Sequence, residues 1–292
     1  MRRLLVYTLI GCGSSSSPDK KEAPAPLPAP VPIAIDAPTA PPTLSPELRA
    51  KWERGCFMLR TPSGLVENDH ARCTEARRPY STFKLANALI ALDAGVLADA
   101  DAPMTWDKKA VPDEKRYFDS WRQDHTLRSG IKVSSVPHFR TLALAIGEPR
   151  MKAGLAKLDY GNQNIGGALS EFWLTKGKLA ITAEQQLAFV DKLARGTLAT
   201  SPKAQEVVRD ISTLETKGTR VLHGKTGSGP GSDVQPPRAD YLMWQVGWIE
   251  DGKQIVPYAT WIEITGGTFD EARAKREELL RGTFAELGVF PR

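Results

Sequence analysis

The 292-residue sequence has few of the features that mark metal-binding, membrane-spanning or nucleic-acid-binding proteins. Its four histidines are scattered and offer no paired ligand spacing for zinc. No apolar run approaches the roughly 20 residues of a membrane-spanning helix. Basic residues exceed acidic ones by only five, and no stripe of lysine and arginine is interleaved with aromatics. The composition therefore predicts an ordinary globular protein with no metal and no nucleic-acid partner.

The first 12 residues have the pattern of an export signal. Arg2 and Arg3 precede a short apolar run, residues 4–10, that is too short to span a bilayer. The run ends in Leu-Ile-Gly-Cys, which resembles a bacterial lipobox, in which Cys12 is lipidated and becomes the mature N-terminus. A plain secretory signal is the alternative. Both interpretations predict export, to the periplasm or to a lipid anchor on a bacterial membrane.

Residues 13–47 are rich in serine, proline and alanine. Such a composition favours extended polyproline geometry and cannot bury a core. We expect a disordered linker that tethers a single folded domain, residues 48–292. A segment that binds a proline-recognising module is the alternative.

Besides Cys12, the chain contains Cys56 and Cys73. An even pair in an oxidising compartment favours a disulfide, and the two cysteines flank a predicted hairpin. Two separate buried thiols are the alternative. Neither cysteine has a neighbouring histidine that would activate it as a thiolate.

Secondary-structure signals divide the domain into three parts, because strand patterns lie at both ends and helical patterns lie between them. The predicted elements are strands at 54–60, from 65, at 241–249 and at 254–264, and helices at 81–93, through most of 100–218, and at 269–287. This order predicts an α+β fold in which a central antiparallel sheet, built from N- and C-terminal strands, is flanked by helices and carries an inserted all-helical lobe. We expect a cleft between sheet and lobe.

The strongest candidate for chemistry is Ser81-Thr-Phe-Lys84, which opens a predicted amphipathic helix. At a spacing of three residues, the lysine amine lies one turn from the serine hydroxyl on the same face. A serine hydroxyl becomes a strong nucleophile when a base takes its proton. Lysine can serve as that base only if burial lowers its pKa from about 10.4. The second Ser-x-x-Lys copy, Ser129 to Lys132, contains a glycine and is interpreted as a turn without catalytic role.

Three further short motifs follow in order. Ser134-Ser-Val136 begins a helical run, Tyr160-Gly161-Asn162 lies in a polar loop, and Lys225-Thr226-Gly227 lies on a predicted strand. Each is weak alone, but their order and contexts together are specific. In these motifs the chain resembles the active-site serine β-lactamases and penicillin-binding proteins, and among them the class D β-lactamases. The resemblance covers about residues 55–287 and is most specific over 160–174, Tyr-Gly-Asn-Gln-Asn-Ile-Gly-Gly-Ala-Leu-Ser-Glu-Phe-Trp-Leu.

The resemblance implies a hydrolase that opens β-lactam antibiotics through an acyl-enzyme on Ser81. Lys84 would react with carbon dioxide to form an N-carboxylated lysine, the general base of both half-reactions, and no other cofactor is implied. The indole of Trp173 would hold the carbamate, with Val136 and Leu174 on its dry side. Packing in the core is the alternative role of Trp173.

Further site residues are implied by the same resemblance. Ser134, next to Lys225, would pass a proton to the leaving nitrogen, and the backbone of Ser81 and Ser228 would form the oxyanion hole. Thr226, Gly227, Ser228 and Arg273 would bind substrate, and Arg273 is also interpretable as a solvated helix residue. Tyr160, Gly161 and Asn162 are expected mainly to shape their loop. Ser228 occupies a position at which many relatives carry an aromatic residue. The segment after it, residues 229–237, is unusually rich in glycine and proline.

Two alternative functions fit the same motifs. A penicillin-sensing receptor domain is acylated without turnover, and a peptidoglycan transpeptidase or carboxypeptidase acts on cell-wall peptides. The class D-like loop at 160–174 and the compact length disfavour the transpeptidase. The sensor domain also resembles class D, but it normally carries membrane helices and a protease domain, and the sequence shows a pattern for neither.

Overall fold

The computed structural model describes residues 40–231 and 240–291. The predicted signal segment with Cys12, most of the predicted linker, and part of the glycine- and proline-rich segment lie outside these residues. In the described part of the chain, no helix combines the length and apolarity needed to cross a membrane.

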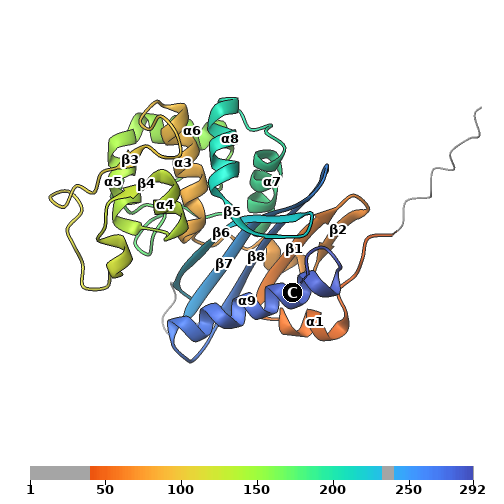
Figure 1. Cartoon of the computed structure of the whole chain (residues 1–292). Coiled ribbons are helices and arrows are strands. Elements are labelled where there is room, and N and C mark those ends of the chain that lie inside the picture. The colour runs from red at the N-terminus through yellow and green to blue at the C-terminus, as the bar shows by residue number, and fades with distance from the viewer. Residues whose placement is uncertain (1–39, 232–239, 292) are drawn as a thin grey trace, which may run out of the picture. The chain divides into compact units, whose positions relative to one another are not determined.

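A six-stranded antiparallel sheet forms the centre of the fold, in the order β2-β1-β8-β7-β6-β5 (Figure 1). Its strands are β1 (Gly55–Thr61), β2 (Gly64–Glu67), β5 (Thr213–Lys217), β6 (Arg220–Pro230), β7 (Tyr241–Asp251) and β8 (Gln254–Ile264). The two N-terminal strands join the sheet through the antiparallel pair β1–β8. The sheet is thus built from both ends of the domain, as predicted.

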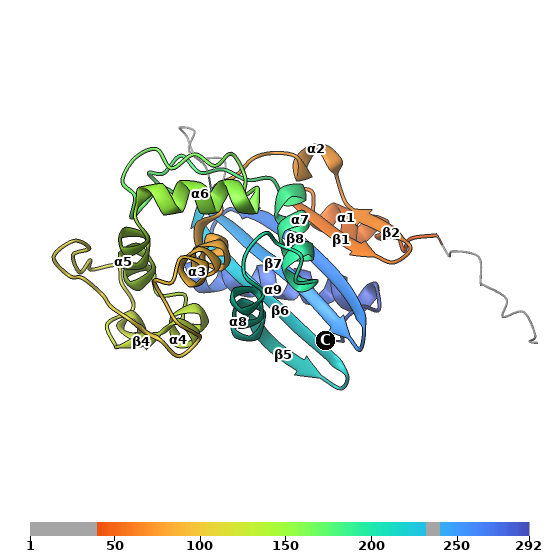
Figure 2. The ribbon, with the colours of Figure 1, turned by 90° about the horizontal axis from the view of Figure 1, so that it is seen from above.

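Each face of the sheet is covered, and side chains alternate between two cores. On β1, Cys56 and Met58 belong to the core shared with the helical lobe, whereas Phe57 and Leu59 belong to a core with α1 (Pro46–Lys51) and α9 (Phe269–Glu286). Figures 1 and 2 show α9 and α1 on one face, and α7 on the other.

Most of the remaining helices, with the two-stranded sheet β3–β4, form the helical lobe beside the sheet (Figure 1). They are α3 (Lys84–Asp93), α4 (Leu127–Lys132), α5 (Val136–Ile146), α6 (Glu148–Leu158), α7 (Ala183–Ala194) and α8 (Pro202–Ile211), with short 3-10 turns η1 (Tyr80–Phe83) and η2 (Asp119–Trp121) and strands β3 (Pro103–Met104) and β4 (His125–Thr126). The short helix α2 (His70–Cys73) lies beside β1 instead (Figure 2). The lobe surrounds α3, whose residues from Lys84 to Ala91 are all buried.

Local signals read from the sequence appear at several helix starts. Thr182 and Gln185 form a reciprocal capping box at α7, and the Ser201 hydroxyl caps α8 before a first-turn proline. These caps satisfy backbone N–H groups that a helix start otherwise leaves unpaired.

Three features differ from the predictions. Residues 213–217 form the edge strand β5, within the range expected to be helical. The folded part also begins earlier than residue 48, because Leu44 is buried in the α1–α9 core and α1 starts at Pro46. The segment from Ser129 to Lys132 is the end of helix α4 rather than a turn.

Cys56 and Cys73 are joined in a disulfide. It links β1 to α2, the short helix that follows the β1–β2 hairpin, and both cysteines are buried.

Candidate active site

Ser81 lies in the 3-10 turn η1, directly before α3. The preceding residue, Tyr80, has a φ of 47°. This left-handed conformation is uncommon for a bulky residue, and such backbone strain concentrates at functional sites. Ser81 is partly exposed and lines a pocket, while the other three residues of the turn, Tyr80, Thr82 and Phe83, are buried.

The amine of Lys84 lies beneath this serine, at 0% exposure of the residue. Its Nζ lies 2.7 Å from the Ser81 Oγ, 3.1 Å from the Ser134 carbonyl oxygen and 3.2 Å from the Ser134 Oγ. Burial, and secondarily the charge of Lys225, hold the pKa of Lys84 well below its ordinary value. A neutral amine has a free lone pair, so Lys84 can accept the proton of Ser81.

Ser134 connects α4 to α5 and has a φ of 56°. This backbone turns both its carbonyl and its hydroxyl within hydrogen-bond distance of Lys84. Val136, two residues on, begins α5 and lines the pocket.

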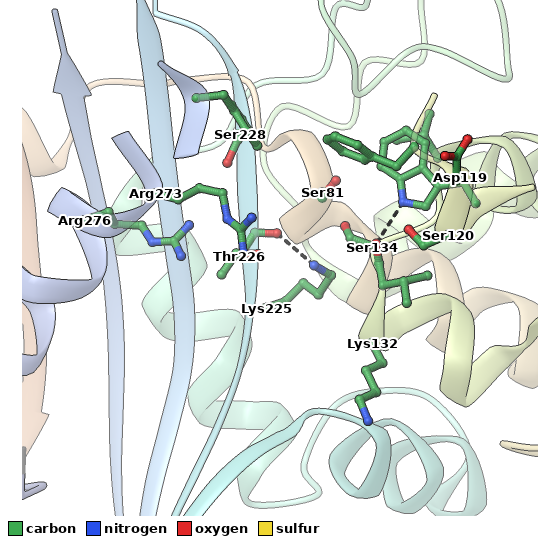
Figure 3. Close-up of a pocket in the computed structure, with 15 residues that line it drawn as sticks. Ser81, Asp119, Ser120, Lys132, Ser134, Lys225, Thr226, Ser228, Arg273 and Arg276 are labelled. Atoms are coloured by element: carbon green, nitrogen blue, oxygen red, sulfur yellow. Dashed lines mark hydrogen bonds between the residues drawn. The ribbon is translucent and has the colours of Figure 1, made fainter. Parts of the chain in front are cut away.

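Strand β6 brings Lys225, Thr226 and Ser228 to the other side of Ser81 (Figure 3). The approach requires Gly227, because a Cβ there would lie 2.7 Å from the Pro79 carbonyl oxygen. Lys225 is buried and donates a hydrogen bond to the Thr226 carbonyl, at 3.0 Å. Burial, and secondarily the charge of Arg276, lower the pKa of Lys225 to about 7.

These groups meet in a cavity of about 580 Å³ (Figure 3). Seven of the residues singled out in the sequence line it: Ser81, Ser134, Val136, Lys225, Thr226, Ser228 and Arg273. The cavity therefore unites three of the four motifs, with Lys84 one layer below its wall.

Trp173 is buried in the core and packs against Phe83, the residue before Lys84, with ring centroids 5.1 Å apart. Its indole N–H is buried and has no hydrogen-bond partner. A buried donor of this kind is unusual, since nearly all such groups are paired. Leu174 lines a second cavity of about 630 Å³, which shares Val136 and Ser228 with the first.

The loop motif at 160–162 lies outside both cavities. Tyr160 is buried, and its hydroxyl accepts a hydrogen bond from Gln186 at 3.2 Å. The Asn162 side chain joins two stretches of the loop by donating to the Lys178 carbonyl at 3.0 Å and accepting from the Ala180 N–H at 3.0 Å. Gly161 has a φ of 56°. These contacts hold the shape of the loop that carries Trp173.

The second Ser-x-x-Lys copy has a different environment. The Ser129 Oγ accepts the Thr126 N–H at 2.9 Å in a capping box of α4. Lys132 is exposed and lines the first cavity. In the described residues, no group of three His, Cys, Asp or Glu side chains is placed to hold a metal ion.

Comparison with known proteins identifies the family. The profile of the penicillin binding protein transpeptidase domain matches residues 48–277. The β-lactamase OXA-10 of Pseudomonas aeruginosa is 37% identical over 216 residues, which are 73% of this chain and 77% of that protein. The structure of FUS-1 (OXA-85), a class D β-lactamase from Fusobacterium nucleatum subsp. polymorphum, matches with a TM-score of 0.74 at 33% identity, over 84% of this chain and 99% of its own. The chain belongs to the class D β-lactamase family.

A further similar structure is that of the class D β-lactamase YbXI from Nostoc. It matches with a TM-score of 0.73 at 32% identity, over 83% of this chain and 99% of its own.

Several residues that line the first cavity of this class D β-lactamase family member were not singled out in the sequence: Phe118, Asp119, Ser120, Trp121, Phe269 and Arg276. Phe118 and Trp121 stack edge to face at 4.8 Å, and Phe118 reaches Phe269 at 6.5 Å. The sequence contains two signals that could have indicated some of these residues. Phe118 and Trp121 are three residues apart, and Arg276 lies three residues after Arg273, on the same helix.

Arg140 forms ion pairs with two segments that border the site in this class D chain. It lies on α5, is buried, and forms ion pairs with Glu114 at 2.7 Å and with Glu171. Its guanidinium also donates to the Tyr117 hydroxyl at 2.6 Å. Glu114 and Tyr117 precede the aromatic pair of the cavity wall, and Glu171 lies two residues before Trp173. Arg140 thus anchors both segments to α5.

Proposed function

We propose that this protein hydrolyses the amide of β-lactam antibiotics through an acyl-enzyme on Ser81. One observation carries the proposal. The Lys84 amine lies 2.7 Å from the Ser81 Oγ, fully buried, with its pKa held well below the ordinary range. A base must be uncharged and within hydrogen-bond reach of the proton that it takes, and Lys84 meets both conditions.

The first half-reaction follows from these positions. Lys84 takes the Ser81 proton while the Oγ attacks the lactam carbonyl carbon, and the backbone N–H groups of Ser81 and Ser228 stabilise the resulting oxyanion. As the carbon–nitrogen bond breaks, Ser134, which is next to Lys84 and faces the same cavity as Lys225, delivers its hydroxyl proton to the ring nitrogen and takes up the proton that Lys84 received from Ser81. Water then hydrolyses the serine ester and releases the opened product.

We propose further that Lys84 is carboxylated by carbon dioxide. A primary amine adds carbon dioxide only when neutral, and the addition releases a proton. The unpartnered Trp173 indole N–H supports the modification, because it would donate a hydrogen bond to the carbamate. Val136 and Leu174, which share a cavity, would border the apolar side of the carbamate. When formed, the carbamate would supply an anionic base for the deacylating water.

Substrate binding is proposed for the wall formed by β6 and α9. Thr226 and Ser228 line this wall and present their hydroxyl groups, and Arg273 contributes positive charge for the substrate carboxylate. Gly227, between them on β6, would contribute backbone groups only. Leu174, in the second cavity, would contact an apolar substituent of the substrate.

Turnover of nitrocefin tests the activity. Ser81→Ala should abolish hydrolysis. Ser129→Ala, which alters the serine of the second copy and costs about 1 kcal/mol of helix capping, should retain it. A single stoichiometric burst without turnover would indicate a sensor domain or a transpeptidase and would contradict the proposal.

The bicarbonate response tests the carbamate separately. Activity should rise when bicarbonate is added to carbon-dioxide-depleted enzyme and should fall at acid pH, because protonation of the amine reverses carboxylation. Full activity in carbon-dioxide-depleted buffer, with no response to bicarbonate, would contradict carboxylation of Lys84. It would leave the proposal that the free Lys84 amine acts as the base.

We also propose that the protein is exported and anchored through a lipid on Cys12. The Cys56–Cys73 disulfide supports export, because disulfides persist in oxidising compartments. Palmitate labelling that Cys12→Ser abolishes would support the anchor, whereas an unlabelled, signal-cleaved product would indicate a plain secretory signal.

A further inference from the structure

Tyr80, the residue before Ser81, combines an unusual backbone conformation with a buried side chain. Its φ is 47°, and it is 3% exposed in the core shared with the helical lobe. A bulky residue with a positive φ is an outlier, and such strain persists only where surrounding contacts hold it in place. The contacts that hold Tyr80 therefore also fix the peptide group that carries the Ser81 N–H.

Strand β6 supplies two of these contacts. The Tyr80 ring lies directly against the backbone of Gly229, because a Cβ on that glycine would come within 2.2 Å of two ring atoms. The Tyr80 hydroxyl donates a hydrogen bond to the Pro230 carbonyl oxygen, at 3.0 Å, although the two residues are 150 positions apart in the sequence. One tyrosine side chain thus joins η1 to the end of β6.

Strand β6 and η1 also meet at Gly227, which approaches the Pro79 carbonyl oxygen. Residues two apart on a strand face the same side, so Gly227 and Gly229 both face the turn. Ser228 lies between these two contacts, and Figure 3 shows Ser81 and Ser228 on the two neighbouring elements. The separation of the Ser81 and Ser228 N–H groups is therefore set by how closely β6 is held against η1.

We propose that Tyr80 is a positioning residue, which holds β6 against η1 and thereby keeps the Ser81 and Ser228 N–H groups at the separation that the oxyanion requires. The inference rests on the proposed acyl-enzyme mechanism, in which these two groups stabilise the oxyanion. Tyr80 also lines the second cavity, so direct contact with a substrate substituent is the competing role. The two roles differ in whether Tyr80 acts on the transition state or on substrate binding.

Single-turnover acylation by nitrocefin measures the first role. Tyr80→Phe removes only the hydroxyl contact with Pro230 and should slow acylation about 2- to 10-fold. Tyr80→Asn removes the ring but readily accepts a positive φ, and it should slow acylation about 100-fold. If the left-handed backbone alone positioned Ser81, the asparagine variant would acylate at the wild-type rate, and that result would overturn the proposal.

Tyr241→Phe is the matched control. Tyr241 lies opposite Pro230 on β7, and its hydroxyl donates to the Gly267 carbonyl oxygen at 3.4 Å. The variant therefore removes a tyrosine hydroxyl from the same end of the sheet without touching η1. Its acylation rate should equal that of the wild type.

Phenylboronic acid tests the oxyanion hole directly. Its boron binds the Ser81 Oγ while the serine proton passes to the base, and the tetrahedral adduct places an oxygen where the oxyanion forms. In both Tyr80 variants the dissociation constant of this adduct should rise by about the factor by which acylation slows. In the Ser81→Ala background, Tyr80→Phe should change the dissociation constant of nitrocefin less than about twofold. Weaker nitrocefin binding with unchanged boronate affinity would indicate direct substrate contact and would overturn the positioning role.

A purely structural role would give another pattern. Loss of folded protein would lower the amplitude of acylation but leave its rate constant and the boronate affinity unchanged, which would also contradict the proposal. Tyr80→Phe keeps the ring in the core, so it provides the comparison if Tyr80→Asn does not fold.

The boronate result also separates this inference from the proposed function. A wild type that binds phenylboronic acid in a manner that depends on Tyr80, but hydrolyses no β-lactam, would refute the function and keep the positioning role. Equal boronate affinity in the wild type and the Tyr80 variants, or no binding by the wild type, would overturn the positioning role.

Discussion

Replacing Lys225 by methionine should make the protein more stable and less active. Burial and the charge of Arg276 lower the pKa of Lys225 from 10.5 to about 7. The unfolded chain therefore binds a proton that the folded protein largely lacks between pH 7 and 10.5, and stability from this group rises with pH across that window. A difference of three to four pKa units corresponds to about 4 kcal/mol of destabilisation at pH 7. Methionine removes this cost and fills a similar volume.

Urea unfolding of carbon-dioxide-depleted protein at pH 7, 8.5 and 10 measures the effect. Lys225→Met should exceed the wild type by up to about 4 kcal/mol at pH 7, and the gain should shrink to less than about 1 kcal/mol at pH 10. Lys132→Met is the control, because it removes an exposed lysine from the same cavity and should change stability by no more than about 0.5 kcal/mol.

Bicarbonate extends the experiment. A carbamate on Lys84 would place a negative charge near Lys225 and favour its protonated form, so bicarbonate at pH 7.5 should reduce the stability gain of Lys225→Met. Turnover of nitrocefin by this variant should fall throughout. A gain that is the same at every pH, or a loss of stability at pH 7, would refute the reasoning, because neither follows from a buried lysine with a lowered pKa.

Three further predictions concern the surroundings of the site. Trp173→Phe keeps most of the packing but removes the unpartnered indole N–H. The bicarbonate concentration that gives half-maximal activity should therefore rise about 10- to 100-fold. An unchanged concentration would show that Trp173 does not bind the carbamate. Arg140→Met removes the buried partner of two half-buried carboxylates, so it should cost about 1–3 kcal/mol in urea unfolding. A cost below about 0.5 kcal/mol would show that the ion pairs do not anchor the two segments. Gly227→Ala places a Cβ 2.7 Å from the Pro79 carbonyl oxygen, which forces β6 away from η1. This separation should lower the free energy of unfolding by about 1–3 kcal/mol and slow acylation by nitrocefin at least about tenfold. Acylation at the wild-type rate would contradict this close approach.

Much of the architecture could be predicted because it depends on local patterns. Strand alternation, helical periodicity and caps such as Thr182 and Ser201 are properties of short segments, and they indicated a sheet made from both ends of the domain. Strand β5 escaped prediction because it is an exposed edge strand with little apolar alternation, and its pairing with β6 supplies the hydrogen bonds that define it.

The candidate site also contains some residues that local sequence could predict and others that it could not. Ser81 and Lys84 are three residues apart, so one turn of chain fixes their contact, and the sequence by itself determined that pair. The family motifs then located Ser134 and Lys225, which chain geometry alone could not bring together.

Only the tertiary structure decided the environment of these groups, because burial and charge are sums over neighbours from distant segments. Ser129 and Lys132 have the same spacing as Ser81 and Lys84, yet the lysine of the second pair is exposed and its serine caps a helix. Likewise Arg273 and Arg276 lie on one helix, and packing against the sheet leaves one in solvent and buries the other against Lys225. Sequence spacing sets which atoms can meet, whereas the assembled fold sets how much water remains around them and hence their chemistry.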